Sequence, residues 1–299
     1  MELNFEIPDL TGKITIVTGA NSGIGLETTR TFAANGATVV MACRNPEKAQ
    51  LAASEIRNTN PQAKLELLEL DLASLKSVRK FAGDFSARYD RLDILANNAG
   101  VMALPEHYKT ADGFEMQFGT NHLGHFALTG LLLPLILKTP AARIVNVASM
   151  AHKWGKFNPE NLNAEKSYQK MGAYGLAKLS NLLFTYELQR KFEQFDIDAM
   201  AVAAHPGWSN TNLQKYSNAF MFGNKLFAQS SYMGALPTVR AAVATDVQGS
   251  DYYGPKNWGG WRGQAVKVES NEASHNEADA TVLWATSEKL TDVNFNWET

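Results

Sequence analysis

Tyr174 and Lys178 have side-chain types and a spacing that could carry out proton transfer. They lie four residues apart within segment 173–192, whose apolar residues recur at helical spacing, so both side chains are expected on one helix face. A free phenol has a pKa of about 10, and a cation one helical turn away stabilises the phenolate and lowers that pKa. The pair could therefore donate a proton to a carbonyl oxygen, or accept one from an alcohol, near neutral pH.

The same spacing recurs at Tyr252 and Lys256, so the spacing alone is weak evidence. This second pair encloses Pro255, and because proline disrupts a helix interior, its two side chains cannot share a helix face. The alternative for the first pair is structural, with Tyr174 at the edge of the core and Lys178 in solvent. We favour the chemical interpretation, because further polar groups fall at matching places along the chain.

A glycine-rich turn follows the first apolar run, Ile14–Thr18, and a helix is expected from Leu26. Glycine lets the chain turn tightly and brings its backbone close to a ligand. A helix N-terminus then presents free N–H groups and a positive dipole end to a phosphate. The spacing is GxxxGxG rather than GxGxxG, and a plain strand–helix turn is the alternative. The residues expected to contact a dinucleotide here are Gly19, Asn21, Ser22, Gly23, Ile24 and Gly25.

The end of the second expected strand distinguishes two dinucleotides. In a dinucleotide-binding fold this end contacts the adenosine ribose, and an acid there accepts a hydrogen bond from the 2′-hydroxyl of NAD. Here Arg44 follows Cys43, and its planar guanidinium can pair with a 2′-phosphate, while Lys48 lies one helical turn further on. A solvated arginine is the alternative. We expect NADP(H) as the cofactor, with NAD(H) as the rival.

Alternating strands and helices must position these groups. Short apolar runs predict strands over 14–18, 38–42, 65–70, 94–96, 144–147 and 199–203, most of them apolar on both faces as in a covered parallel sheet. Helical spacing predicts helices over 46–57, 74–89 and 173–192, and stretch 126–137 is expected to be a buried or interface helix. This alternation predicts an α/β fold, a Rossmann-type, doubly wound parallel sheet in three α/β/α layers with right-handed crossovers.

The last third of the chain lacks a clean period. Segment 208–235 is expected to form a small lid, and segment 249–263 a C-terminal wall, of one domain spanning residues 1–299. Their large apolar side chains predict a roomy pocket for a lipophilic aldehyde, ketone or alcohol: Trp208, Phe220, Met221, Phe222, Phe227, Tyr232, Met233, Trp258 and Trp261. The alternative is that these side chains pack the lid onto the sheet. His152 and His205 are interpreted as structural or wall residues, because Tyr174 already supplies the acid or base.

Composition narrows the classes of function. The chain has 28 Lys and Arg residues and 30 Asp and Glu residues, so its net charge is −2. This near balance indicates neither nucleic acid nor an anionic membrane surface as a partner. The lone cysteine, Cys43, excludes an intrachain disulfide and fits a reducing cytoplasm. No signal peptide is expected, stretch 126–137 is too short for a membrane span, and no cluster has metal-ligand spacing.

Taken in order, the motifs resemble those of the short-chain dehydrogenase/reductase family over nearly the whole chain. They are TGxxxGIG at 18–25, an Asp after the third strand, NNAG at 97–100, an Asn in the next helix, a Ser after the fifth strand, YxxxK, and a PG after the sixth strand. The resemblance implies that the catalytic residues are Asn121, Ser149, Tyr174 and Lys178. It also implies cofactor contacts from Asp71, Leu72, Asn98, Ala99, Gly100, Pro206, Gly207, Trp208 and Thr211, besides Tyr174 and Lys178.

The resemblance also implies what each catalytic group does. Lys178 binds the nicotinamide ribose, Ser149 hydrogen-bonds the substrate oxygen and holds it against Tyr174, and Asn121 anchors a water that relays protons to Lys178. Asp71 contacts the adenine. The step of 25 residues from Ser149 to Tyr174 is longer than in the main branch of the family. Together with the Ala-Cys-Arg-Asn strand end and NHLGHF at 121–126, it resembles the retinol dehydrogenase-like and WW-domain oxidoreductase-like branch.

The activity implied is NADP(H)-dependent interconversion of a carbonyl compound and an alcohol, with Tyr174 as acid or base. The rivals are an NAD(H)-linked alcohol dehydrogenase, a protochlorophyllide-type reductase, and a non-catalytic NADP(H)-binding regulator. The complete set of four catalytic residue types disfavours the regulator. The resemblance also implies a homodimer or homotetramer that pairs helices near 123–137 and 173–192, with a monomer as the alternative.

Overall fold

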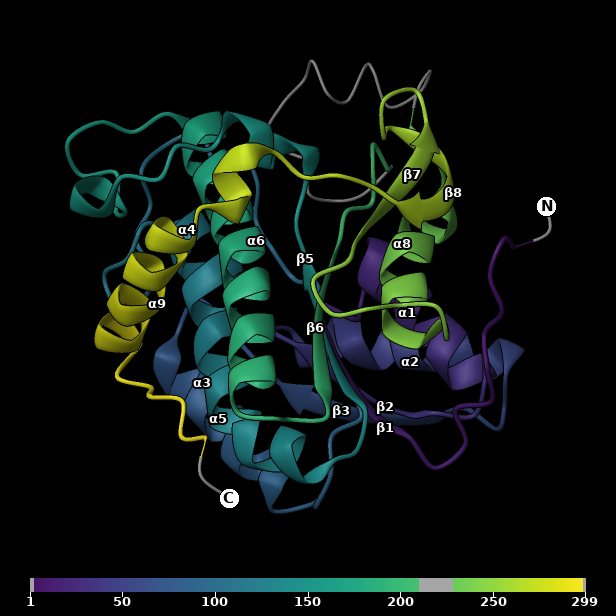
Figure 1. Ribbon diagram of the computed structural model, residues 1–299. Coiled ribbons are helices and arrows are strands. Elements are labelled where there is room, and N and C mark those ends of the chain that lie inside the picture. Colours follow the sequence, from purple (N-terminus) through teal and green to yellow (C-terminus); the bar gives the residue numbers. More distant parts are fainter. Residues whose placement is uncertain (1–2, 210–227, 298–299) are drawn as a thin grey trace.

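The computed structural model describes residues 3–209 and 228–297 and places the strands of these segments in one continuous sheet (Figure 1). The strands are β1 (Ile14–Thr18), β2 (Thr38–Cys43), β3 (Lys64–Glu69), β4 (Ile94–Asn97), β5 (Ala142–Val147), β6 (Ala199–Ala204), β7 (Tyr252–Asn257) and β8 (Arg262–Lys267). Their order is β3-β2-β1-β4-β5-β6-β7-β8, and only the β7–β8 pair is antiparallel. The predicted doubly wound parallel sheet is therefore confirmed, and the strand order reverses between β1 and β4.

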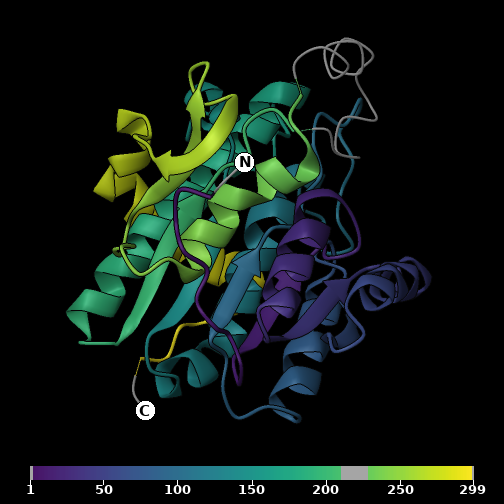
Figure 2. The same cartoon turned by 90° about the vertical axis from the view of Figure 1, so that its right-hand side faces the viewer.

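Helices cover both faces of the sheet, which makes the predicted three layers (Figures 1 and 2). One face carries α1 (Gly23–Ala34), α2 (Pro46–Thr59) and α8 (Ser231–Val243). The other carries α3 (Leu75–Ser86), α5 (Gly124–Lys138), α6 (Lys170–Gln194) and α9 (Glu277–Thr291). Short helical turns connect them: α4 (Met116–Phe118), the π-helical η1 (Gly119–Leu123), η2 (Met150–Trp154), η3 (Pro159–Asn161) and η5 (Glu272–His275).

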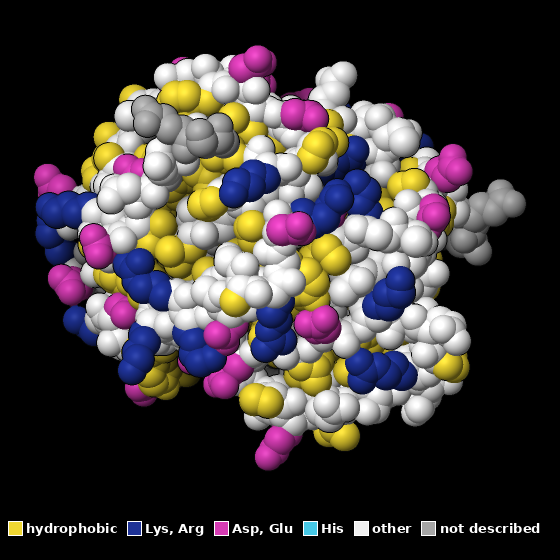
Figure 3. Space-filling model, turned by 90° about the horizontal axis from the view of Figure 1, so that it is seen from below, with side chains coloured by type: hydrophobic (Ala, Val, Ile, Leu, Met, Phe, Trp, Pro, Cys, Tyr) yellow, Lys and Arg dark blue, Asp and Glu magenta, His cyan; other side chains and the backbone are white. Residues whose placement is uncertain are grey.

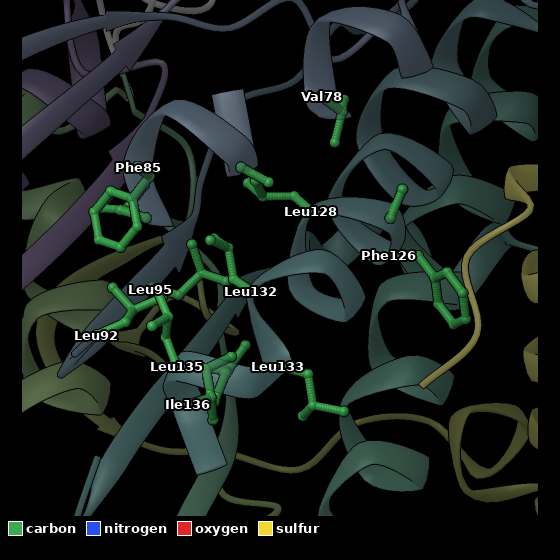
Figure 4. Close-up of a cluster of buried hydrophobic side chains, with 14 of the residues drawn as sticks. Val78, Phe85, Leu92, Leu95, Phe126, Leu128, Leu132, Leu133, Leu135 and Ile136 are labelled. Carbon is green, nitrogen blue, oxygen red and sulfur yellow. The ribbon is translucent and has the colours of Figure 1, made fainter. Parts of the chain in front are cut away.

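Each face of the sheet has its own hydrophobic core, because strand side chains alternate between the faces. Ile16 packs into the core beneath α3, α5 and α6, whereas its neighbour Val17 packs into the core beneath α1, α2 and α8. This explains why the strands read as unbroken apolar runs. Figure 4 shows part of the first core, with Phe85 of α3 and Leu132 of α5 among its members.

Aromatic side chains from distant parts of the chain meet where α9 covers α5 and α6. Phe126 lies with its ring centroid 5.2 Å from that of Phe184, 5.3 Å from Trp284 and 4.9 Å from Phe295. Trp297 packs 5.7 Å from Phe295 at the end of the described chain. The apolar surfaces of α5 and α6 are thus covered within the chain, and the homo-oligomer expected from those surfaces stays a prediction.

Three boundaries differ from those expected. Helix α1 begins at Gly23 rather than Leu26, so the last two glycines of the turn form its first turn. Segment 249–263 is largely the β7–β8 hairpin, which extends the sheet. Within β7, Tyr252 and Tyr253 are the residues that pair with β6, so Pro255 lies where no N–H is needed on that side. Of segment 208–235, the end forms the first turns of α8, and residues 210–227 lie outside the described residues.

One helical segment of the described chain, Met116–Lys138, is long and apolar enough to cross a membrane. Its most apolar window is 83% buried inside the protein, as in the core helix of a globular fold. A lone helix of this kind is weak evidence for a span, because a buried core helix passes the same length and hydropathy test.

Charged side chains are mixed on the face seen in Figure 3, where Lys and Arg alternate with Asp and Glu. Across the described residues, several such side chains form salt bridges, such as Lys80 with Asp84 at 2.6 Å and Arg30 with Glu55 at 2.6 Å. These pairs are largely exposed, so each contributes little to stability. This face therefore presents no extended field of one sign.

We expect Phe126→Ala to lower the free energy of unfolding by about 3–5 kcal/mol, because this ring is fully buried at the meeting point of α5, α6 and α9. Urea unfolding followed by circular dichroism measures the change. Leu51→Ala is the control, since the Leu51 side chain is 72% exposed and its loss should change the free energy by less than about 0.5 kcal/mol. Equal effects of the two substitutions would contradict the packing described.

Candidate active site

The carboxyl ends of the parallel strands border an open cleft of about 370 Å³. Most residues expected at a cofactor site line it: Gly19, Asn21, Ser22, Gly23, Ile24, Gly25, Arg44, Asp71, Leu72, Asn98, Ala99, Gly100, Tyr174, Lys178 and Pro206. Also expected at the site, but not lining the cleft, are Lys48, Asn121, Ser149, Gly207 and Trp208, while Thr211 lies outside the described residues. The cleft is also lined by residues that the sequence did not single out, among them Val101, Met102, Thr120 and Val147.

The glycine turn leaves room that side chains would fill. Gly19 and Gly23 have φ angles of +69° and +55°, the left-handed region that glycine adopts without strain. A Cβ on Gly25 would collide with the Gly19 carbonyl oxygen and come within 2.6 Å of Asn98 Nδ2. Ser22 precedes α1 and makes no side-chain cap, so the first N–H groups of this helix face the cleft uncapped. The turn therefore fits the pyrophosphate of a dinucleotide.

The Thr18 hydroxyl joins three loops of the site. It accepts the backbone N–H groups of Asn98 and Ala99, both at 2.9 Å, and lies 2.9 Å from His125 Nε2. His125 Nδ1 lies 2.9 Å from the Asn121 carbonyl oxygen, which can only accept, so Nδ1 carries the proton and Nε2 accepts from Thr18. Burial lowers the pKa of His125 to about 4, which keeps the ring neutral. No sequence signal assigned His125 to the site.

Asn121 lies in the π-helical turn η1 and is fully buried. Its side-chain amide pairs with both backbone groups of Val101, donating to the carbonyl oxygen at 2.9 Å and accepting the N–H at 2.8 Å. A Cβ on Gly100 would lie 2.9 Å from Asn121 Oδ1. The amide therefore holds the loop after β4 against η1, and the water expected on Asn121 stays a prediction.

Arg44 lies where β2 ends, lines the cleft and is exposed. Its guanidinium makes no salt bridge with another residue of segments 3–209 and 228–297. Lys48 is also exposed and lies in the first turn of α2, where its N–H donates to Asn45 Oδ1 at 2.8 Å. Asp71 follows β3 and accepts the Ala73 N–H at 3.0 Å. Arg44 thus borders the cleft at the adenosine end expected for a dinucleotide, and Lys48 lies in the first turn of α2 just beyond it.

Tyr174 and Lys178 share one face of α6 and are both buried, with 6% and 4% of their surfaces exposed. Lys178 Nζ lies 5.8 Å from the centroid of the Tyr174 ring and donates to the Val147 carbonyl oxygen at 2.8 Å. The Ser149 hydroxyl accepts the Ala151 N–H at 3.2 Å and lies close enough to the Tyr174 phenol to lower its pKa slightly. The structure thus brings together three of the four residues expected to be catalytic, at the ends of β5 and the start of α6.

Burial decides the protonation of this pair. It raises the pKa of Tyr174 to about 12, against a smaller opposite effect of the nearby Ser149 hydroxyl. It lowers the pKa of Lys178 to about 7. The lowered phenol pKa expected from a nearby cation is therefore wrong for this structure, because the loss of hydration around the buried phenol outweighs the effect of the neighbouring lysine. Tyr174 is protonated at neutral pH.

The long connection from Ser149 to Tyr174 packs against segment 103–118. Tyr168 donates from its hydroxyl to the Leu104 carbonyl at 2.8 Å, and Gln117 Nε2 donates to the Lys170 carbonyl at 3.0 Å. Asn163 Oδ1 accepts the backbone N–H of Glu115, the residue before α4, at 3.1 Å. This connection, including η2 and η3, therefore forms an ordered side of the site rather than a loose loop.

Residues 206–209 and the β7–β8 hairpin form the side of the site opposite the connection from Ser149 to Tyr174. Gly207 has a φ of +64°, and the Trp208 N–H donates to the Trp261 carbonyl at 2.8 Å. The two indole rings lie 5.0 Å apart. Gln229, which the sequence did not single out, donates to the Pro206 carbonyl at 2.8 Å. The apolar lid residues Phe220, Met221, Phe222 and Phe227 lie outside the described residues.

Comparisons with known proteins agree with this geometry. The family model for short chain dehydrogenases matches residues 13–221. The chain belongs to the short-chain dehydrogenase family. It is 39% identical to retinol dehydrogenase 12 of Mus musculus over 298 residues, which cover 99% of this chain and 90% of that protein. The resemblance to the retinol dehydrogenase-like branch is thereby confirmed.

Two solved structures resemble this short-chain dehydrogenase. The first is a protein of Mycobacterium paratuberculosis, 40% identical, with a TM-score of 0.82 over 97% of each chain. The second is a short chain dehydrogenase of Shigella flexneri complexed with NADP, 25% identical, with a TM-score of 0.65 over 81% of this chain and 95% of that chain. The family consists of oxidoreductases that bind a nicotinamide cofactor, and the uncapped α1 and glycine turn fit such a group.

The buried Lys178 of this short-chain dehydrogenase should destabilise the fold. Between pH 10.5 and about 7 the folded chain binds fewer protons at Lys178 than the unfolded chain does, so the penalty grows as pH falls and is complete below pH 7. We expect Lys178→Met to raise the free energy of unfolding by about 1–4 kcal/mol near pH 6.5, and by less near pH 9. Urea unfolding at both pH values measures this.

Lys170→Met is the control for that substitution, because Lys170 is exposed at the start of the same helix. It should change the free energy of unfolding by less than about 0.5 kcal/mol at either pH. A loss of stability in Lys178→Met at both pH values would show that the hydrogen bond to Val147 outweighs the cost of burying the ammonium.

Proposed function

We propose that this short-chain dehydrogenase interconverts a lipophilic aldehyde or ketone and the corresponding alcohol with NADP(H). The observation that carries the proposal is that Tyr174 and the buried Lys178 line the same cleft as the glycine turn, with the Ser149 hydroxyl near the phenol. A phenol with a donor beside it can act on a substrate oxygen. The dinucleotide site next to it supplies the redox partner.

Backbone groups and side chains along the cleft would hold the cofactor. The uncapped N–H groups of α1 suit the pyrophosphate, Arg44 and Lys48 suit a 2′-phosphate, and Asp71 suits the adenine. Lys178 suits the nicotinamide ribose. When bound, the reduced nicotinamide supplies the hydride that the carbonyl carbon receives.

The protein's own residues would donate and stabilise the proton that the reaction transfers. Tyr174 is protonated at neutral pH, so in the direction of reduction it donates its phenolic proton to the carbonyl oxygen. The Ser149 hydroxyl hydrogen-bonds the same oxygen and fixes its distance from the phenol. Lys178 then stabilises the phenolate that forms, because its ammonium lies on the same helix face, 5.8 Å from the ring centroid.

Two observations support NADP(H) over NAD(H). No acid stands at the end of β2, where the 2′-hydroxyl of NAD would be recognised, and Arg44 lies there exposed. The Shigella flexneri relative was solved in complex with NADP. A lipophilic substrate is supported by Trp208 and Trp261 beside the cleft and by relatives named retinol dehydrogenases.

Activity should depend on Tyr174. We expect the wild-type protein to consume NADPH with a panel of lipophilic aldehydes and ketones, and Tyr174→Phe to lose about 10³-fold or more of kcat while binding NADPH with unchanged affinity. Tyr89→Phe is the control, since Tyr89 follows the end of α3, packs with its ring 4.9 Å from that of Phe85 and does not line the cleft. NADPH binding without turnover of any carbonyl would favour the regulatory rival.

Cofactor preference should depend on Arg44. We expect Arg44→Asp to weaken NADPH binding by about 10-fold or more and to leave NADH binding unchanged or stronger, because the carboxylate repels a 2′-phosphate and accepts from a 2′-hydroxyl. Fluorescence titration with both cofactors measures the ratio. Lys289→Asp makes the same change of net charge on α9 and should leave the ratio unchanged. An unaltered ratio in Arg44→Asp would refute the role given to Arg44.

A further inference from the structure

His152 lies in η2, three residues after Ser149, and is 1% exposed. Its Nδ1 lies 2.6 Å from the Ser149 carbonyl oxygen, and its Nε2 lies 3.2 Å from the backbone nitrogen of Asn271. The carbonyl can only accept and the amide can only donate, so Nδ1 carries the proton and Nε2 accepts the Asn271 N–H. A neutral ring of one defined tautomer thus connects two backbone groups.

Several neighbours act on the charge of this ring. Burial lowers the pKa of His152, and Lys153 and His275 act in the same direction, while the hydrogen bond to the Ser149 carbonyl acts in the opposite direction. Tyr252 meets the ring edge-on at 5.8 Å and itself packs at 5.2 Å from the buried His205. A second proton on His152 would point at the Asn271 N–H with no acceptor, so only the neutral ring keeps both hydrogen bonds.

Asn271 is fixed in turn to the helix that carries Tyr174. The neighbouring Ser270 hydroxyl lies 2.8 Å from the Tyr186 hydroxyl of α6 and 2.8 Å from His275 Nε2. The His275 ring stacks on the Tyr186 ring with centroids 4.6 Å apart. The contacts therefore run from α6 through residues 270–275 and the His152 ring to the Ser149 carbonyl.

We propose that His152 is a positioning residue, which fixes the backbone of Ser149 through Asn271 and so holds the Ser149 hydroxyl against the Tyr174 phenol. The inference rests on the reaction proposed above. The orientation of the Ser149 carbonyl sets the backbone torsions of Ser149 and hence the direction of its Cβ and hydroxyl. That hydroxyl must meet both the phenol and the substrate oxygen, and small displacements of such groups reduce rates strongly.

A double-mutant cycle with Ser149 tests the proposal. We expect His152→Leu to lower kcat about 10- to 100-fold, with little change in KM or in NADPH affinity. In a Ser149→Ala background the same substitution should lower kcat by less than about twofold, because no hydroxyl is left to position. An equal loss in both backgrounds, or no loss in the first, would overturn the proposal.

Two conservative variants separate positioning from packing. His152→Asn keeps an N–H near the Nδ1 position but loses the acceptor that meets Asn271, so it should recover only part of the kcat lost in His152→Leu. His152→Gln presents its amide near the Nε2 position, loses the donor to the Ser149 carbonyl and should resemble His152→Leu. His107→Leu is the control, since His107 also bonds a backbone carbonyl, that of Asn163 at 2.7 Å, but not that of Ser149. It should leave kcat unchanged.

A measurement without turnover keeps this inference separate from the proposed function. If the wild-type protein reduces no carbonyl compound, the proposed function fails. Nitrogen-15 spectra of the histidine rings then test whether His152 forms the two hydrogen bonds to Ser149 and Asn271. The spectrum of His152→Asn assigns the signals of this ring. A neutral ring protonated at Nδ1 at neutral pH supports the proposal, and the Nε2-protonated tautomer or an imidazolium overturns it.

Discussion

The burial of an ammonium group at the end of β5 is the constraint on which the site depends. The Lys178 side chain is buried away from water next to the Tyr174 ring, and its Nζ donates a hydrogen bond to the Val147 carbonyl oxygen. Burying such a cation is unfavourable, so the surrounding fold must supply the stability that retains it. The two cores on either side of the sheet do this, and they also fix the strand end and the helix that the lysine joins.

Neutral histidines join the loops around this buried cation. His125 connects Thr18 to the Asn121 carbonyl, and His152 connects Asn271 to the Ser149 carbonyl. Each ring donates from Nδ1 and accepts at Nε2. An imidazole suits this task because its donor and acceptor are held at a fixed distance on a rigid plane, and burial keeps it uncharged. The site is therefore ordered by side chains that need not touch a substrate.

The sequence predicted what depends on local periodicity and on motif order. The strand β1 was predicted with the same two ends, the sheet class was correct, and most of the residues expected around a dinucleotide line one cleft. Helix α9 and the pairing of β7 with β8 were not predicted, because they depend on contacts between distant residues. The pKa of Tyr174 was predicted in the wrong direction, since spacing reveals a neighbouring charge but not the loss of water around it.

Helix α9 has a consequence for the order in which this protein can fold during synthesis. Trp284 and Phe295, near the end of the chain, complete the aromatic cluster around Phe126 and Phe184. Until α9 and the residues after it have left the ribosome, the rings of Phe126 and Phe184 lack these partners. Between the synthesis of Phe184 and that of Trp284, the nascent chain therefore carries an apolar surface that α9 later covers.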